Sequence, residues 1–135
     1  MRERTRARQL AVQYLYQYDL LKEKASEVDD FLADEGAEGE VASFARLLIR
    51  GCREHWDELN QTVIEVSEHW QLNRMPVVDR NVLRVGAYEL KYCDDIPSKV
   101  SINEAIELAK VFGGKDSGGF VNGLLDKIRA KYEDE

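Results

Sequence analysis

The chain has 135 residues, of which 44% are hydrophobic and 33% are charged, and its formal net charge is −7. The length fits one domain or two very small ones, and the composition is that of a globular protein rather than a disordered one. No apolar run approaches the ~18 residues of a membrane span, and no apolar segment follows the first charges. We therefore expect neither a membrane span nor a secretory signal, and a cytoplasmic protein. Cys52 and Cys93 are too few for a disulfide framework and are expected to be reduced and buried.

The first ten residues carry a charge opposite to that of the rest of the chain. In "RERTRARQL", Arg2, Arg4, Arg6 and Arg8 stand against one acid, Glu3, so residues 1–10 are +3 and the remaining residues are −10. Such a local asymmetry of charge calls for a partner. A solvated, frayed helix end explains an isolated arginine cluster equally well.

Hydrophobic residues recur at steps of three and four nearly everywhere, which predicts helices. The first helix is expected over about residues 3–22, and a second lies around Phe31 and ends at the two glycines of "EGAEGE". The same spacing continues from Val41 to Trp70. This segment is either one long helix or two helices with a bend near residues 57–60.

Pro76 is the clearest break in the chain, because proline is tolerated at a helix start but disrupts a helix interior. It predicts a new helix that ends at "DDIP". Ser101–Glu104 has the spacing of a capping box, which predicts the start of the next helix, and the glycine pair at 113–114 predicts its end. Asp116 or Ser117 is expected to cap the last helix. No alternating strand pattern is present, so the predicted fold is all-α.

Two blocks of the sequence resemble the NusB family of bacterial transcription antitermination proteins. "RTRARQLAVQYLYQYDL" is similar to the amino terminus of that family, and "DRNVLRVGAYEL" followed by "DDIPSKVSINEAIELAKVFGGKDSGGFVNGLLDKI" is similar to its carboxy-terminal half. Both blocks occur in the order and at the spacing of the family. The resemblance implies two small helical bundles packed together, with about seven helices, which we assign to residues 1–75 and 76–135.

The resemblance also implies a function. NusB proteins bind a short single-stranded RNA element called boxA, in leader transcripts of ribosomal RNA operons, together with NusE, a small-subunit ribosomal protein. It implies action within the antitermination complex of RNA polymerase, and it admits a homodimer, because some family members dimerise. The alternative is a non-enzymatic helical adaptor that binds protein only, such as in ribosome assembly, with the arginines solvated.

Candidate site residues are carried over from the family. The expected RNA contacts lie at the amino terminus and at the start of the last helix: Arg2, Arg4, Arg6, Arg8, Asp116, Ser117 and Phe120. Gly119 departs from the basic residue that many family members carry there, so the contact is expected to be thinner. Tyr16 and Asp79 match residues that face NusE. Their structural explanations are packing against the neighbouring bundle for Tyr16 and a helix first-turn acid for Asp79.

Other chemistries fit the sequence less well. "FGGKDSGGFVNG" lacks the spacing of a Walker phosphate loop, and no strand precedes it. Cys52 and His55 share a helix face, but two ligands do not make a zinc site. No nucleophile with a base and no paired carboxylates can be identified. We therefore expect no enzymatic activity, no metal and no cofactor.

Overall fold

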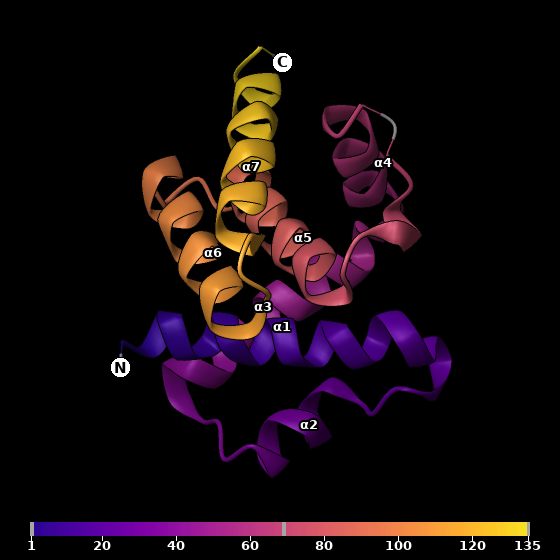
Figure 1. Cartoon of the computed structure of the whole chain (residues 1–135). Helices are drawn as coiled ribbons and strands as arrows, with labels where there is room; N and C mark the ends of the chain where they lie inside the picture. Colours follow the sequence, from indigo (N-terminus) through magenta and orange to yellow (C-terminus); the bar gives the residue numbers. More distant parts are fainter. Residues whose placement is uncertain (1, 69, 135) are drawn as a thin grey trace.

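The computed structural model of the chain describes residues 2–68 and 70–134. Within these residues it contains seven α-helices, two short 3₁₀-helices and no strand (Figure 1). The predicted all-α class is therefore confirmed. In chain order the elements are α1 (Glu3–Leu21), η1 (Lys22–Lys24), α2 (Val28–Asp34), α3 (Gly39–Glu54), α4 (Trp56–Val66), η2 (Leu72–Arg74), α5 (Val77–Tyr92), α6 (Ser98–Phe112) and α7 (Ser117–Glu133). None of the described helices combines the length and apolar character that a membrane span requires.

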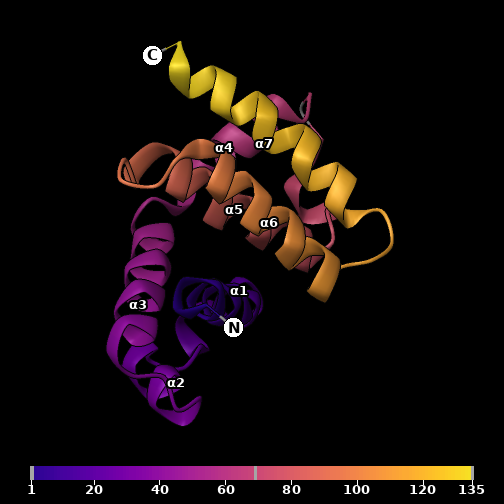
Figure 2. The same ribbon diagram turned by 90° about the vertical axis from the view of Figure 1, so that its left-hand side faces the viewer.

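Helix α1 lies at the centre of the molecule. Figure 2 shows it nearly end-on, with α2 and α3 on one side and α5, α6 and α7 on the other. Helix α4 packs against α3, α5 and α7, so it reaches from the first part of the chain to the second. Buried apolar residues from all seven α-helices form one continuous core. The division into bundles at residues 75 and 76 stays a prediction.

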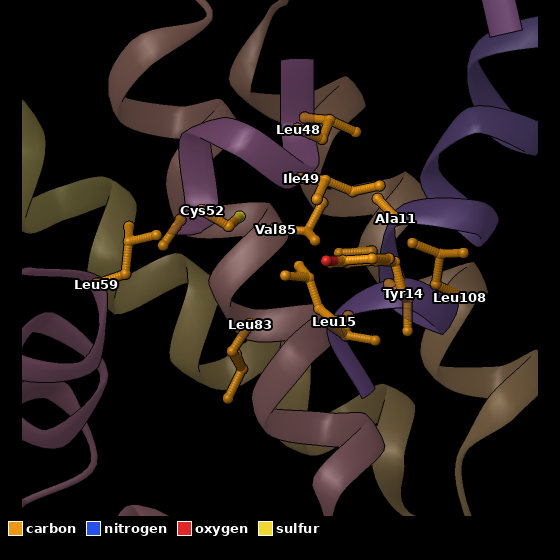
Figure 3. Close-up of a cluster of buried hydrophobic side chains, with 14 of the residues drawn as sticks. Ala11, Tyr14, Leu15, Leu48, Ile49, Cys52, Leu59, Leu83, Val85 and Leu108 are labelled. Atoms are coloured by element: carbon orange, nitrogen blue, oxygen red, sulfur yellow. The ribbon is translucent and has the colours of Figure 1, made fainter. Parts of the chain in front are cut away.

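The core forms where apolar faces of α1, α3 and α5 meet. Tyr14 and Leu15 from α1 lie beside Ile49 from α3 and Leu83 from α5, and all four side chains are fully buried (Figure 3). A Cβ on Gly51 of α3 would lie only 2.2 Å from the ring of Tyr88 in α5. Glycine at this position therefore lets the two helices approach each other closely.

Most predicted helix boundaries agree with the structure. Helix α5 begins directly after Pro76, and α6 ends at Gly113, as predicted. The segment from 41 to 70 forms two helices, but they break at His55 rather than at residues 57–60. The backbone N–H of His55 still donates to the Gly51 carbonyl, and the His55 carbonyl accepts from the backbone N–H of Leu59, so His55 belongs to the hydrogen bonding of both helices.

The capping-box prediction at Ser101–Glu104 is wrong. Helix α6 begins one turn earlier, at Ser98 after Pro97, and the Pro97 carbonyl accepts the backbone N–H of Ser101. The Ser101 hydroxyl instead donates to Glu89 of α5, and Glu104 accepts from the first turns of α1. The serine and glutamate at capping spacing therefore join helices rather than end one.

Candidate nucleic-acid interface

The arginines at the start of α1 lie in different surroundings. Arg2 precedes the helix, is exposed and makes no ion pair with any described residue. The Arg4 guanidinium lies 3.3 Å from Glu40 and 3.7 Å from Asp95, with 42% of its side chain exposed. The Arg6 guanidinium lies 3.9 Å from Glu35 and is similarly exposed. Three of the four arginines are therefore accessible, and two of them already face carboxylates.

Arg8 differs from the other three because it is 3% exposed. Its Nε and Nη2 atoms each donate to a carboxylate oxygen of Glu89 at 2.8 Å, and its Nη1 donates to Glu104 at 2.8 Å. Burial would lower the pKa of Arg8, but the hydrogen bonds and charges of Glu89 and Glu104 outweigh it and raise the pKa. The guanidinium therefore stays charged inside the protein and ties α1 to α5 and α6. The RNA contact expected at Arg8 stays a prediction, and the burial of its side chain favours a structural role.

Two clefts follow the side of the molecule where α6 runs beside the start of α1. A cleft of about 450 Å³ is lined by Arg2 and Arg4 together with residues at the start of α6, among them Pro97 and Val100. A smaller one of about 80 Å³ lies between Gln9 of α1 and Val111 near the end of α6. Both clefts are lined by residues of α1 and α6, and α6 continues to its connection with α7 (Figure 1).

The connection between α6 and α7 is held in a fixed conformation by Ser117. This residue is 5% exposed, and its Oγ accepts the backbone N–H of Gly114 at 3.0 Å. A Cβ on Gly113 would lie 2.5 Å from that Oγ and 2.6 Å from the Ala109 carbonyl, so only glycine fits there. Asp116 occupies the cap position of α7 and is exposed, but its side chain makes no cap hydrogen bond. The structure thus presents Asp116 on the surface and uses Ser117 internally.

Phe120 is partly buried in the first turn of α7 and packs edge to face against Trp70, with ring centroids 5.3 Å apart. Trp70 is 43% exposed. The apolar spacing of the sequence places Trp70 in a helix stripe and predicts no contact with Phe120. The contact joins residues fifty positions apart, and periodicity carries no signal of it.

The residues expected to face a protein partner lie on α1 and α5. Tyr16 is 43% exposed, and Leu20, one turn later on α1, is 55% exposed. Asp79 lies in the first turn of α5, but it is 4% exposed, and its Oδ1 has no hydrogen-bond partner among the described residues. The adjacent Arg80 donates to Asp19 at 2.6 Å, which fixes the start of α5 against the last turns of α1.

The two cysteines are free and buried, as predicted. The Cys52 thiol donates to the Arg84 carbonyl, and burial raises its pKa far above the ordinary value. Burial also raises the pKa of Cys93 to about 11. His55 stacks on Tyr92, with ring centroids 4.2 Å apart. The described residues contain no group of three or more His, Cys, Asp or Glu side chains placed to hold a metal ion.

These features define a small all-α protein whose central helix α1 carries accessible arginines at its start, and in which a glycine-rich connection joins α6 to α7. The model of the NusB family matches residues 5–130. The chain belongs to the NusB family.

Relatives and solved structures agree with this assignment over nearly the whole chain. The transcription antitermination protein NusB of Trichlorobacter lovleyi is 47% identical, and the match covers 98% of this chain and 94% of the relative. That of Desulfosudis oleivorans is 44% identical, and the match covers 95% of this chain and 86% of the relative. The structure of T. maritima NusB has a TM-score of 0.85 at 38% identity and covers 96% of this chain and 92% of its own. A crystal structure of the antitermination factors NusB and NusE in complex with double-stranded RNA has a TM-score of 0.85 at 27% identity, and covers 98% of this chain and 99% of its own.

Proposed function

We propose that this chain is an RNA-binding transcription antitermination factor, which binds boxA RNA of ribosomal RNA operon transcripts together with the ribosomal protein NusE. It does so within the antitermination complex of RNA polymerase, in the cytoplasm, and by binding rather than by catalysis. One observation carries the proposal. Three accessible arginines gather at the start of α1 on an otherwise acidic chain, in a family that includes a NusB solved with NusE and RNA.

The chemistry of these arginines suits an unpaired RNA strand. A guanidinium offers a planar fork of donors to phosphate and also stacks on exposed bases. The carboxylates that face Arg4 and Arg6 do not prevent this, because all three ion pairs are solvent-exposed and at least 3.3 Å long. Exposed pairs of this kind contribute only about 0–1 kcal/mol. A phosphate can therefore replace a carboxylate at little cost.

The same carboxylates explain why a protein partner is needed. Glu35, Glu40 and Asp95 remain beside the arginines after RNA displaces them, and the body of the protein is acidic. Like charges at this distance repel the phosphate backbone and lower the association rate. RNA alone therefore binds weakly, and a partner that supplies positive charge raises the affinity.

The exposed side chains of Tyr16 and Leu20 on α1 fit such a partner. Two large apolar side chains stand exposed one turn apart on α1, and aromatic residues are typical of protein interfaces. Buried carboxylate oxygens nearly always have a donor, yet Oδ1 of Asp79 has none among the described residues. Because this oxygen is buried, its missing donor does not by itself favour an interface, and the contact of Asp79 with NusE is proposed from the family resemblance alone.

The RNA part of the proposal is tested by salt dependence. Anisotropy of a labelled boxA RNA is titrated at several salt concentrations with the wild-type protein and with Arg2→Gln, Arg4→Gln and Arg6→Gln combined. Each neutralised phosphate on a single strand contributes about −0.7 to the slope of log affinity against log salt. For the triple variant, the magnitude of this slope is expected to fall by about 2, and RNA is expected to bind more weakly.

A matched control is Arg129→Gln on α7. Its side chain is 40% exposed, against 42% for Arg4, and it also pairs with surface carboxylates. It is expected to leave both the slope and the affinity unchanged. If the triple variant behaves like this control, the arginines are solvated and the protein-only adaptor becomes the better account.

A further inference from the structure

Trp70 is a large apolar side chain held firmly at the surface. Its backbone N–H donates to the Ser67 carbonyl at 3.3 Å, and the connection continues through η2 to Met75, which is buried. Its ring meets that of Phe120 at an interplanar angle of 86°, yet 43% of the residue stays in contact with water. The contact with Phe120 thus positions the side chain, which still presents much of its ring to solvent.

The surface of α7 next to this pair is open. A Cβ at Gly119 or at Gly123 would meet nothing within 4 Å, so internal packing does not require glycine at either position. Glycine inside a helix is destabilising relative to alanine. Gly123 lies one turn from Phe120 on the same side of α7. Bare backbone beside two aromatic rings lets a ligand approach closely.

Positive charge without a partner flanks the pair. Arg74 follows Trp70 by four residues in η2, and Lys127 lies two turns beyond Phe120 on α7. Both are exposed, and neither forms an ion pair with a described residue. Aromatic rings joined to cations are the chemistry by which proteins hold unpaired nucleic acid, since bases stack and phosphates are neutralised.

We propose that Trp70 stacks on an unpaired base of bound RNA, with Phe120 as its edge-on neighbour and with Arg74 and Lys127 on the adjoining phosphates. This inference rests on the proposed RNA-binding function and extends the RNA path beyond the connection between α6 and α7. A ring added beside a perpendicular aromatic pair stacks on one member and meets the edge of the other. Phe120 therefore positions Trp70 as well as offering a contact of its own.

The direct test uses the intrinsic fluorescence of Trp70. The chain has two tryptophans, so Trp56→Phe leaves Trp70 as the only source of tryptophan emission. Phenylalanine keeps an aromatic ring against Tyr18, which packs edge to face on Trp56 at 5.1 Å. Titration with boxA RNA is expected to quench the emission, because a stacked base lies against the indole. Titration with NusE alone is expected to leave it unchanged.

Affinity measurements give an independent readout. Trp70→Leu is expected to weaken boxA RNA binding by about fivefold to a hundredfold without changing the salt slope, since stacking neutralises no phosphate. Arg74→Gln is expected to reduce the magnitude of the slope of log affinity against log salt by about 0.7. Leu47→Ala on α3 is the control, because Leu47 is also a large apolar residue at the surface, 46% exposed, and it should leave the affinity for RNA unchanged.

Each other outcome overturns the inference. If the wild-type protein binds RNA but Trp70 emission and the Trp70→Leu affinity stay unchanged, the proposed function stands and the stacking role falls. If Trp70→Leu lowers the melting temperature and nothing else, Trp70 only packs against Phe120. If NusE changes the Trp70 emission and RNA does not, the surface around Trp70 binds protein. If the wild-type protein binds no RNA, the proposed function and this inference fail together.

Discussion

Arg8→Ala should destabilise the protein strongly, although Arg8 belongs to the basic segment that we propose for RNA. The substitution removes three hydrogen bonds of 2.8 Å and leaves the carboxylate of Glu89, whose side chain is 1% exposed, without its cation. Breaking a buried ion pair from one side costs about 3–5 kcal/mol, because the remaining charge stays buried and uncompensated.

The assay is urea denaturation followed by circular dichroism. Arg8→Ala is expected to reduce the free energy of unfolding by about 3–5 kcal/mol, which is a large part of the total stability of a small protein. Arg6→Ala is the control within the same segment, since its pair with Glu35 is 3.9 Å long and exposed. It should change stability by less than about 0.5 kcal/mol.

A second variant identifies the cause. Adding Glu89→Gln to Arg8→Ala removes the uncompensated charge and should recover part of the lost stability, because the two residues are directly coupled. A loss of unfolding free energy below about 1 kcal/mol for Arg8→Ala would refute the buried network. If the effects of the two substitutions simply add in the double variant, the uncompensated charge of Glu89 is not the cause of the loss. Weak RNA binding by Arg8→Ala is therefore no measure of a phosphate contact.

Three further predictions concern the core, the pH dependence and the RNA affinity. Leu125→Ala should cost about 2–5 kcal/mol in urea denaturation, because Leu125 is fully buried and its truncation leaves a cavity. Burial would raise the pKa of Asp19, but hydrogen bonds from Arg80 and a second arginine hold it at about 2, below its ordinary 3.8. Asp19 should therefore contribute about 2 kcal/mol above pH ~4 that is lost as the pH falls toward 2, and Asp19→Asn should abolish this part of the acid transition. Glu40→Gln with Asp95→Asn should raise RNA affinity by about two- to tenfold in anisotropy titrations, since both acids compete with phosphate for an arginine.

The positions of most helices could be predicted from the sequence because they depend on local chemistry. Apolar periodicity places α1 within one residue of its observed end, and Pro76 fixes the start of α5. The capping prediction at Ser101–Glu104 failed for a physical reason. The same side chains that can close a helix end also make good hydrogen bonds to other helices, and only the three-dimensional packing decides between these uses.

The accessibility of the candidate residues could not be predicted, because it depends on contacts between distant segments. Arg8 reads like its three neighbours in the sequence, yet its partners lie 81 and 96 residues away. Asp79 reads as an exposed first-turn acid but is 4% exposed. Tyr16 does stand on the surface, as its polar helix face indicates. The pairing of Trp70 with Phe120 likewise follows from tertiary packing alone.

The effect of NusE on RNA affinity tests the central claim most directly. Anisotropy of a labelled boxA RNA is measured with this protein alone, with NusE alone and with both, beside an RNA of the same length and shuffled sequence. We predict weak binding by the protein alone, and tighter, boxA-selective binding by the two proteins together, reduced by Arg2→Gln, Arg4→Gln and Arg6→Gln combined. An affinity of the mixture equal to that of NusE alone, with no response to these substitutions, would contradict the account and favour an adaptor that binds protein only.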